Sequence, residues 1–439
     1  MRQDVHPLCR LRGWPVHVPL EKGGLFPGMR KNILCEDRSL KTAIFGRIPF
    51  PSKRIHGGVI MQIYLDHAGT TPLTETVKSY LTELLDQYGN PSSPHSTGER
   101  AAQILADARQ SVAGFLHSDP GDLYFTPSGS ASNTLAVRGL TSDNPRKDSF
   151  EVFYSPTAHK SMLKVCESCT RHIPLEVDSA GRINPSRLDT VLTQHNFRRP
   201  LVCIEAASSE IGTIHDVAGI GAVVHRHDGL LAVDATGYIP SLPVDLRVWE
   251  KYVDILTFSG HKLHALKGTG VLWKKKAVTL KPLIYGSQQD GIVAGTENVL
   301  GIASLGRAVE AYDYASVSPH NRDYVYAYIT RHIRDCYLVG APIESGDRLP
   351  HNLYVCFRGV EGESLMMLLD MKGIQVSTGS ACNSGSLSAS AALSAIGMKE
   401  ADLHSCIRLS FSGQETVEEL DYVCDTLRQC VADLRWLGK

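Results

Sequence analysis

The chain has 439 residues, of which 43% are hydrophobic and 21% charged, and its formal net charge is -1. This composition is typical of a soluble enzyme with two domains, and the balanced charge argues against a nucleic-acid or membrane-surface partner. No apolar run approaches the roughly 18 residues that span a bilayer. The eleven cysteines lack the spacing of a disulfide framework, so we expect mostly reduced thiols and a cytoplasmic protein.

Residues 1–60 differ from the rest of the chain. They carry eleven Lys or Arg against four Asp or Glu and show no clear periodicity. We expect a flexible basic extension, or upstream sequence that precedes an alternative start at Met29 or Met61. A transit peptide for organellar import is the other interpretation, although the stretch is poor in serine and has no evident amphipathic helix.

From residue 61 onward, strand and helix patterns alternate. The first are a short strand at 63–65, a helix over 74–88 with Thr74 as its N-cap, and an alanine-rich helix over 98–116. Short apolar strands follow at 123–126, 152–154, 201–204, 230–233, 255–258 and 269–273. Such strands, separated by helices, predict an α/β fold with a mostly parallel, buried sheet.

The pattern changes after residue 314. Strands at 352–357 and 406–411 and helices over 364–371 and 417–436 are typical of a smaller α+β domain. We therefore expect a large cofactor-binding domain at 75–313. Residues 61–74 with 314–439 would form the small domain.

Two residues at predicted strand ends point to pyridoxal phosphate. Lys262 follows the strand at 255–258, and Asp234 follows the strand at 230–233. A lysine amine can form a Schiff base with the aldehyde, and an aspartate can keep the pyridine nitrogen protonated. Lys267 competes for the first role, but its glycine-rich surroundings predict a solvent-exposed turn. In isolation, Asp234 could equally cap a helix.

Small polar residues at neighbouring strand ends predict a phosphate site. Ser128-Gly129-Ser130 precedes a helix, and Ser259 follows the same strand that leads to Lys262. Backbone N–H groups at a helix N-terminus, together with hydroxyls, bind anions.

Three further residues are candidates for the chemistry. His159 follows the strand at 152–154 and could stack on a ring or transfer a proton, although an ordinary loop histidine is the alternative. Arg408 lies within an apolar strand, where it needs an anion such as a substrate carboxylate. Cys382 stands among small polar residues, which favours an exposed, reactive thiol. The single Cys166-x-x-Cys169 pair does not predict a metal site.

Six motifs in order make residues 61 to near the C-terminus resemble the cysteine desulfurases, fold-type-I pyridoxal phosphate enzymes of the class V aminotransferase family. The motifs are Tyr64-Leu65-Asp66-His67-Ala68-Gly69-Thr70-Thr71-Pro72, Gly89-Asn90-Pro91-Ser92-Ser93, Val233-Asp234-Ala235-Thr236, Phe258-Ser259-Gly260-His261-Lys262, Ala294-Gly295-Thr296-Glu297-Asn298 and Gly379-Ser380-Ala381-Cys382. The resemblance implies a seven-stranded sheet between helices and a small domain that carries the cysteine loop.

The resemblance also implies a role for each matching residue. Lys262 would be the Schiff-base lysine and Cys382 the nucleophile that forms a persulfide. The remaining implied cofactor and substrate residues are Asp234, His159, Gly129, Ser130, Ser259, His261, Arg408, Asn90 and, from the neighbouring subunit of a homodimer, Thr296.

The chain departs from the family pattern near the cofactor's phenolic oxygen. Gly237 stands where the family usually has glutamine, and Ser208-Ser209 stands where it has two asparagines. Val293 replaces an expected arginine, and His67 replaces an asparagine. These changes predict a divergent desulfurase or a relative with an altered substrate.

The leading hypothesis is therefore conversion of L-cysteine to L-alanine, with the persulfide sulfur passed to an acceptor protein of iron–sulfur or thiocofactor assembly. Selenocysteine lyase or another lyase of the same family is the first alternative, and a non-catalytic scaffold is the second. A dinucleotide-dependent dehydrogenase is excluded because no third glycine follows Gly219-Ile220-Gly221 at the required spacing.

Overall fold

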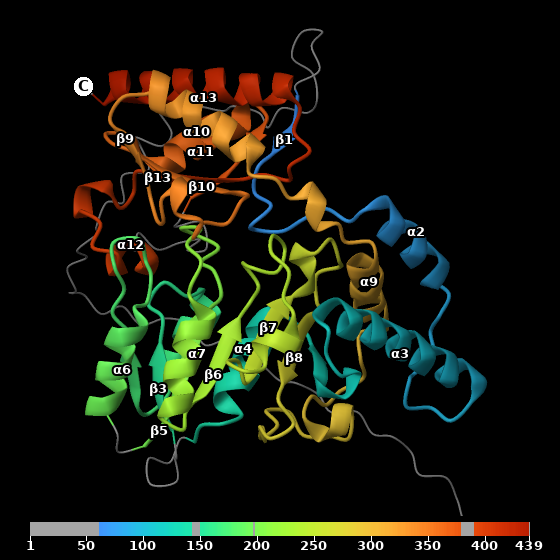
Figure 1. The fold of residues 1–439 in the computed structure, drawn as a ribbon. Coiled ribbons are helices and arrows are strands. Elements are labelled where there is room, and N and C mark those ends of the chain that lie inside the picture. The colour runs from blue at the N-terminus through green and yellow to red at the C-terminus, as the bar shows by residue number, and fades with distance from the viewer. Residues whose placement is uncertain (1–60, 143–149, 196–197, 379–389, 439) are drawn as a thin grey trace, which may run out of the picture. The chain divides into compact units, whose positions relative to one another are not determined.

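The computed structural model describes residues 61–142, 150–195, 198–378 and 390–438, and Figure 1 shows their arrangement. A seven-stranded sheet has the order β2-β8-β7-β6-β5-β3-β4, in which β8 is antiparallel to both neighbours and the other pairs are parallel. The mostly parallel sheet confirms the predicted fold class. Its strands are β2 (Leu123–Thr126), β3 (Phe150–Tyr154), β4 (His172–Pro174), β5 (Arg199–Glu205), β6 (Leu230–Asp234), β7 (Ile255–Ser259) and β8 (Gly270–Lys274).

Helices cover both faces of this sheet, so its central strands are buried throughout. On one face, Leu231 and Val233 belong to a core with α2, α3, α6, α7, α8 and α9. On the other face, Leu230 and Ala232 pack with α4 and α5. The helices are α2 (Glu75–Leu84), α3 (Ser96–Leu116), α4 (Gly129–Arg138), α5 (Lys160–Glu167), α6 (Pro185–Gln194), α7 (Val217–Arg226), α8 (Leu246–Trp249) and α9 (Val299–Glu310).

A smaller antiparallel sheet follows in the chain, with the order β12-β13-β10-β9. Helices α10, α11 and α13 pack on one face around a separate core. The elements are α10 (His320–His332), β9 (Cys336–Leu338), β10 (Asn352–Phe357), α11 (Gly362–Met371), β12 (Ser377–Thr378), α12 (Ala391–Ala395), β13 (Cys406–Ser410) and α13 (Val417–Leu437). The residue boundaries of the two domains stay a prediction.

The first described strand joins the C-terminal part of the chain. Strand β1 (Ile63–Tyr64) pairs in parallel with β11 (Ile374–Gln375). The following loop continues along β13, because Ser410 donates its N–H to the Leu65 carbonyl oxygen at 2.7 Å and accepts from the Ala68 N–H through Oγ at 2.9 Å. The loop then reaches the large sheet, where the Thr71 hydroxyl donates to the His261 carbonyl oxygen at 2.8 Å.

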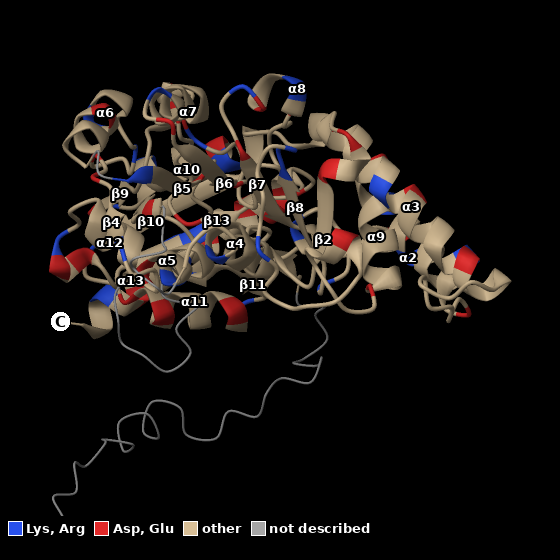
Figure 2. Cartoon of the chain, turned by 90° about the horizontal axis from the view of Figure 1, so that it is seen from below, with Lys and Arg blue, Asp and Glu red and all other residues tan. Residues whose placement is uncertain are grey.

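Several predicted boundaries need correction. The helix predicted over 74–88 begins at Glu75 with Thr74 as its N-cap, but it ends at Leu84 because its buried stripe stops there. Helix α3 starts two residues before the predicted position, at Ser96, with His95 as its N-cap. None of the helices that the structure describes is both long and apolar enough to cross a membrane. Lys and Arg are interspersed with Asp and Glu over the described elements (Figure 2).

Candidate active site

Lys262 lies at the carboxyl end of β7, in a single 3-10 turn over Gly260–Lys262. The strand–turn junction is fixed because the Gly260 N–H donates to the Thr269 carbonyl oxygen at 2.9 Å. Lys262 is 9% exposed and lines a cavity, whereas Lys267 is exposed. Lys262 is thus the buried lysine of the two and Lys267 the exposed one, and the cofactor role of Lys262 stays a prediction.

Asp234 lies at the carboxyl end of β6, the strand beside β7, and is 4% exposed. Its Oδ1 accepts from the Thr236 N–H at 2.8 Å, and its Oδ2 accepts from Asn133 Nδ2 at 2.7 Å. The next described helix, α8, is capped by Asp245, so Asp234 does not cap a helix. Two donors thus hold a buried carboxylate in one orientation at the sheet edge.

His159 caps the N-terminus of α5 and is connected to Asp234 by hydrogen bonds. Its Nδ1 lies 2.8 Å from Ser161 Oγ, and Ser161 Oγ accepts from Asn133 Nδ2 at 3.0 Å. Desolvation lowers the pKa of His159 and the Lys262 cation lowers it further, while the Asp234 carboxylate opposes the shift. His159 is therefore neutral near pH 7.

Asn133 is the residue that joins these groups, and the sequence did not identify it. It is 1% exposed on α4 and contacts Asp234, Ser161 and the Thr257 hydroxyl. The signal was a lone amide among small and apolar residues one turn into a helix. A buried amide needs hydrogen-bond partners, but the sequence cannot say which residues these are.

The N-terminus of α4 meets the end of β7 at the predicted phosphate site. Ser128 is the N-cap, and its Oγ accepts from the Ala131 N–H at 3.1 Å. A Cβ atom at Gly129 would lie 3.1 Å from Ser259 Cβ and 3.4 Å from Thr236 Oγ1. Ser130 is exposed in the first turn. Helix N–H groups and hydroxyls therefore converge where a glycine leaves room, which suits a phosphate group.

His261 lies beside this region, half-buried, with Nδ1 3.0 Å from Thr70 Oγ1. Burial lowers its pKa to about 4, and the cations of Lys262 and Lys267 add to the shift. A neutral His261 can donate one hydrogen bond to an anion without competing with Lys262 for charge.

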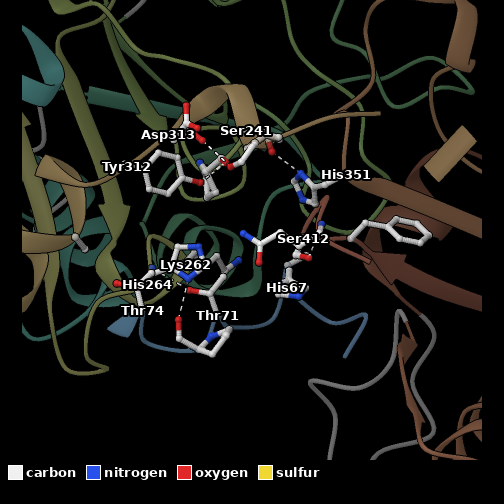
Figure 3. Close-up of a pocket in the computed structure, with 18 of the residues that line it drawn as sticks. His67, Thr71, Thr74, Ser241, Lys262, His264, Tyr312, Asp313, His351 and Ser412 are labelled. Carbon is white, nitrogen blue, oxygen red and sulfur yellow. Dashed lines mark hydrogen bonds between the residues drawn. The ribbon is translucent and has the colours of Figure 1, made fainter. Parts of the chain in front are cut away.

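A cavity of about 520 Å³ opens at Lys262 (Figure 3). Its wall includes His67, Ser241, Tyr312 and His351, and Ser241 Oγ hydrogen-bonds His351 Nδ1. Burial lowers the pKa of His351 to about 3, and the cations of Arg408 and Lys262 contribute. The lining near Lys262 is thus rich in neutral hydrogen-bonding groups.

Arg408 and His159 line a second, smaller cavity of about 80 Å³, which shares Ser209 with the first. Arg408 donates from Nη2 to Asp66 Oδ1 at 2.7 Å and from Nη1 to the Ser209 carbonyl oxygen at 2.9 Å. Asp66 thus supplies an anion to Arg408 within the chain, and the role of Arg408 in binding a substrate carboxylate stays a prediction. Arg408 Nε is buried and has no partner among the described residues.

Two of the departures from the family pattern, Gly237 and Ser209, lie against each other. A Cβ atom at Gly237 would stand 2.7 Å from the Ala207 carbonyl oxygen and 3.2 Å from Ser209 Cβ. The 207–209 loop thus occupies the space that a side chain at 237 would need. Ser209 in turn holds Arg408, so this departure reaches the second cavity.

Two predicted site residues lie outside both cavities, and a third falls outside the described residues. Asn90 is exposed in a loop, where its Oδ1 accepts from the Ser92 N–H at 2.9 Å, and it lines neither cavity. Thr296 is exposed and also lies outside both cavities. Cys382 falls in 379–389, outside the described residues.

The described groups fit pyridoxal phosphate. A buried lysine, a buried carboxylate fixed by two donors and a helix N-terminus with room beside Gly129 meet at one sheet edge. Their chemistry matches an aldehyde, a pyridine nitrogen and a phosphate, respectively. Lys262, Asp234, His159, Ser130 and Ser259 would hold the group.

Comparison with known proteins finds a matching family model and relatives of similar length. The family model described as aminotransferase class-V matches residues 63–423. Cysteine desulfurase IscS of Dictyoglomus turgidum is 33% identical over 390 residues, which cover 86% of this chain and 96% of that protein. A cysteine desulfurase of Cereibacter sphaeroides is 35% identical over 390 residues, covering 86% and 97%.

Solved structures agree with these sequence matches. A NifS-like protein superposes with a TM-score of 0.76 at 28% identity, covering 85% of this chain and 100% of that one. The structure of SspA in complex with cysteine gives a TM-score of 0.69 at 27% identity, covering 81% and 100%.

Proposed function

Since this chain belongs to the class V aminotransferase family, we propose that it is a pyridoxal phosphate-dependent cysteine desulfurase. The reaction converts L-cysteine to L-alanine and leaves the sulfur on Cys382 as a persulfide. The observation that carries this proposal is the hydrogen-bonded series from His159 through Ser161 and Asn133 to Asp234, one strand from Lys262. Relatives named cysteine desulfurase, and a similar structure that holds cysteine, support the substrate.

Bound pyridoxal phosphate supplies an electron sink for charge that develops at the substrate Cα. In this proposal Lys262 Nζ would hold the cofactor through its aldehyde and would accept the proton from the substrate Cα. Asp234 would keep a proton at the pyridine nitrogen, because Asn133 and Thr236 hold its carboxylate in place. His159 would lie against the ring and, being neutral, would not oppose a protonated nitrogen.

Arg408 and Cys382 would act on the substrate itself. The guanidinium of Arg408 binds the substrate carboxylate and competes for it with Asp66, its partner in the chain. The Cys382 thiolate attacks the substrate sulfur, alanine leaves, and an acceptor protein of iron–sulfur or thiocofactor assembly takes the sulfur. Thr296, exposed in one chain, would contribute from the neighbouring subunit of a homodimer, and Asn90 would bind substrate.

The test is an assay of purified protein with added pyridoxal phosphate and reductant. We expect a visible absorption band and equal amounts of alanine and sulfide from L-cysteine. Cys382→Ala should retain the band and lose sulfide release by at least 100-fold, because no other thiol would receive the sulfur. Cys336→Ser, at a half-buried cysteine on β9, is the matched control and should keep full activity.

Other results would change the assignment. A coloured protein that ignores L-cysteine would retain the cofactor and refute the substrate. A protein that stays colourless after the cofactor is added would favour the non-catalytic scaffold.

Selenocysteine lyase is the second candidate, because the groups around Lys262 would act equally on the selenium analogue of cysteine. We would compare kcat/KM for L-cysteine and L-selenocysteine on the same preparation. A ratio strongly in favour of selenocysteine, with Cys382→Ala still active, would replace the first proposal by the second.

A further inference from the structure

Two buried cysteines lie opposite each other on neighbouring strands of the small sheet. Cys356 on β10 is directly opposite Cys406 on the antiparallel strand β13. The Phe357 N–H donates to the Ser405 carbonyl oxygen at 2.8 Å, and the Phe411 N–H donates to the His351 carbonyl oxygen at 3.1 Å. Because hydrogen-bonded pairs alternate along an antiparallel ladder, these bonds make Cys356 and Cys406 a non-hydrogen-bonded pair.

A non-hydrogen-bonded pair has the geometry that a disulfide needs. Its Cα atoms are about 4.5 Å apart, and its side chains leave the same face of the sheet. A disulfide requires a Cα separation of about 4.4–6.8 Å. The backbone can therefore accept a bond between these two residues without a change of strand register.

The thiol groups themselves lie close together. Cys356 Sγ is 3.8 Å and Cys406 Sγ 3.7 Å from the same acceptor, the Asp402 carbonyl oxygen. Their interaction is the main cause of both pKa shifts: it lowers the pKa of Cys356 and raises that of Cys406. Cys356 is thus the thiol that ionises first, and Cys406 is the thiol that retains its proton.

The pair is buried in a small core to which one short helix contributes. The cysteines are 0% and 3% exposed, within a small core that includes Ala392 and Leu393 of α12. Cys406 Sγ also lies 3.9 Å from Met398 Sδ, just after this helix. Because α12 has only five residues, its local opening costs less free energy than global unfolding and would admit a small oxidant.

We propose that Cys356 and Cys406 form an oxidation site that takes hydroperoxides and closes as a cross-strand disulfide. The Cys356 thiolate attacks one peroxide oxygen, the O–O bond breaks, and water leaves with a proton from the medium. The resulting sulfenic acid is attacked by Cys406, which loses its proton as the S–S bond forms and a second water leaves. Overall, two thiols and hydrogen peroxide give one disulfide and two waters.

A disulfide between Cys356 and Cys406 would change the contacts of residues 391–398. Drawing Cys406 Sγ onto Cys356 removes its contact with Met398. Arg408 is two residues along β13 from Cys406 and so lies on the same face of the sheet. Oxidation therefore loosens 391–398 next to the guanidinium, and reduction restores the packing.

Peptide mapping after peroxide treatment tests the bond. Purified full-length protein is treated with hydrogen peroxide, unfolded in iodoacetamide and digested. We expect one linked peptide pair that joins Cys356 to Cys406, lost on treatment with dithiothreitol. Cys356→Ser and Cys406→Ser should each abolish it, and Cys424→Ser, at a buried cysteine on α13, should leave it unchanged. If Cys356 and Cys406 are both recovered as alkylated thiols at a peroxide dose that oxidises half-buried Cys336, the proposal is wrong.

Hydrogen–deuterium exchange tests the consequence on the same samples, without cofactor or substrate. We expect peptides from 391–398 to exchange several-fold faster in the oxidised wild type than in the reduced one. No such difference should appear in Cys406→Ser. Equal exchange in a fully linked sample would overturn the coupling. Neither measurement depends on desulfurase activity, so the inference can fail while the proposed function stands.

Discussion

At the scale of single residues, Gly237 shows how an absent side chain sets the position of its neighbours. The 207–209 loop lies so close that a Cβ atom at 237 would overlap the Ala207 carbonyl oxygen. That loop also supplies the carbonyl oxygen of Ser209 to Arg408. The loop at 207–209 therefore packs into the space beside Gly237. A side chain restored at 237 alone should destabilise the folded protein.

We expect Gly237→Ala to destabilise the protein by about 1–3 kcal/mol, the usual cost of forcing extra atoms into a packed site. The matched control is Gly114→Ala in α3, where a Cβ atom would meet nothing within 4 Å. That change should be neutral or stabilise by about 0.5–1 kcal/mol, because alanine is the better helix former. Urea unfolding measures both, and equal midpoints for the two variants would contradict the packing account.

At the scale of elements, the end of a helix was predicted correctly where a capping residue marks it. Thr74 caps α2 as expected, since its hydroxyl accepts from the Val77 N–H. The far end was wrong because the sequence around Leu85 and Tyr88 remains compatible with a helix. In the structure these residues are 67% and 87% exposed, so no burial extends α2. Whether a helix face is covered depends on tertiary packing, which the local pattern does not contain.

The capping box of α13 gives a prediction for one element. The Thr416 hydroxyl accepts from the Glu419 N–H at 3.2 Å, and the Glu419 carboxylate accepts from the Thr416 N–H at 2.8 Å. We expect Thr416→Ala to lower the free energy of unfolding by about 1 kcal/mol. Thr330→Ala, at an exposed hydroxyl in the last turn of α10, should cost less than half as much. A thermal melt compares the two, and equal losses would argue against the cap.

At the scale of the whole molecule, the sequence placed Lys262 and Asp234 at one sheet edge but did not identify the partners of Arg408 and Asp234. Lys262 and Asp234 follow strands of one parallel sheet, and parallel strands bring their carboxyl ends together. The partner of Arg408 was missed because Asp66 lies 342 positions away in the chain. Asn133 was missed because its partners belong to three other elements. Long-range pairs of this kind have no local signature.

Buried neutral histidines predict how stability depends on pH. The pKa of His351 falls from 6.5 to about 3 in the folded chain. Between these values the unfolded chain binds a proton that the folded chain excludes, so stability decreases as pH falls below about 6.5. The slope for one such group is at most about 1.4 kcal/mol per pH unit.

Urea unfolding at about pH 7 and about pH 5.5 measures this slope. We expect the loss between the two pH values to be smaller in His351→Asn than in the wild type, even if the variant is less stable at both. His320→Asn, at an exposed histidine that starts α10, should retain the full loss. An unchanged loss in His351→Asn would assign the acid sensitivity to other groups.

Residues 63–71 can form their native contacts only late in the synthesis of the chain. This segment is among the first of the described chain to leave the ribosome, yet it is held by β11, by Ser410 and by Arg408 near the other end. Its contacts therefore cannot form until nearly the whole chain has been synthesised. A nascent chain that stops before β13 would retain the β-strands around Lys262 but leave Asp66 without its arginine. A ligand that bound beside Lys262 before then would meet a site that still lacks the Asp66–Arg408 pair.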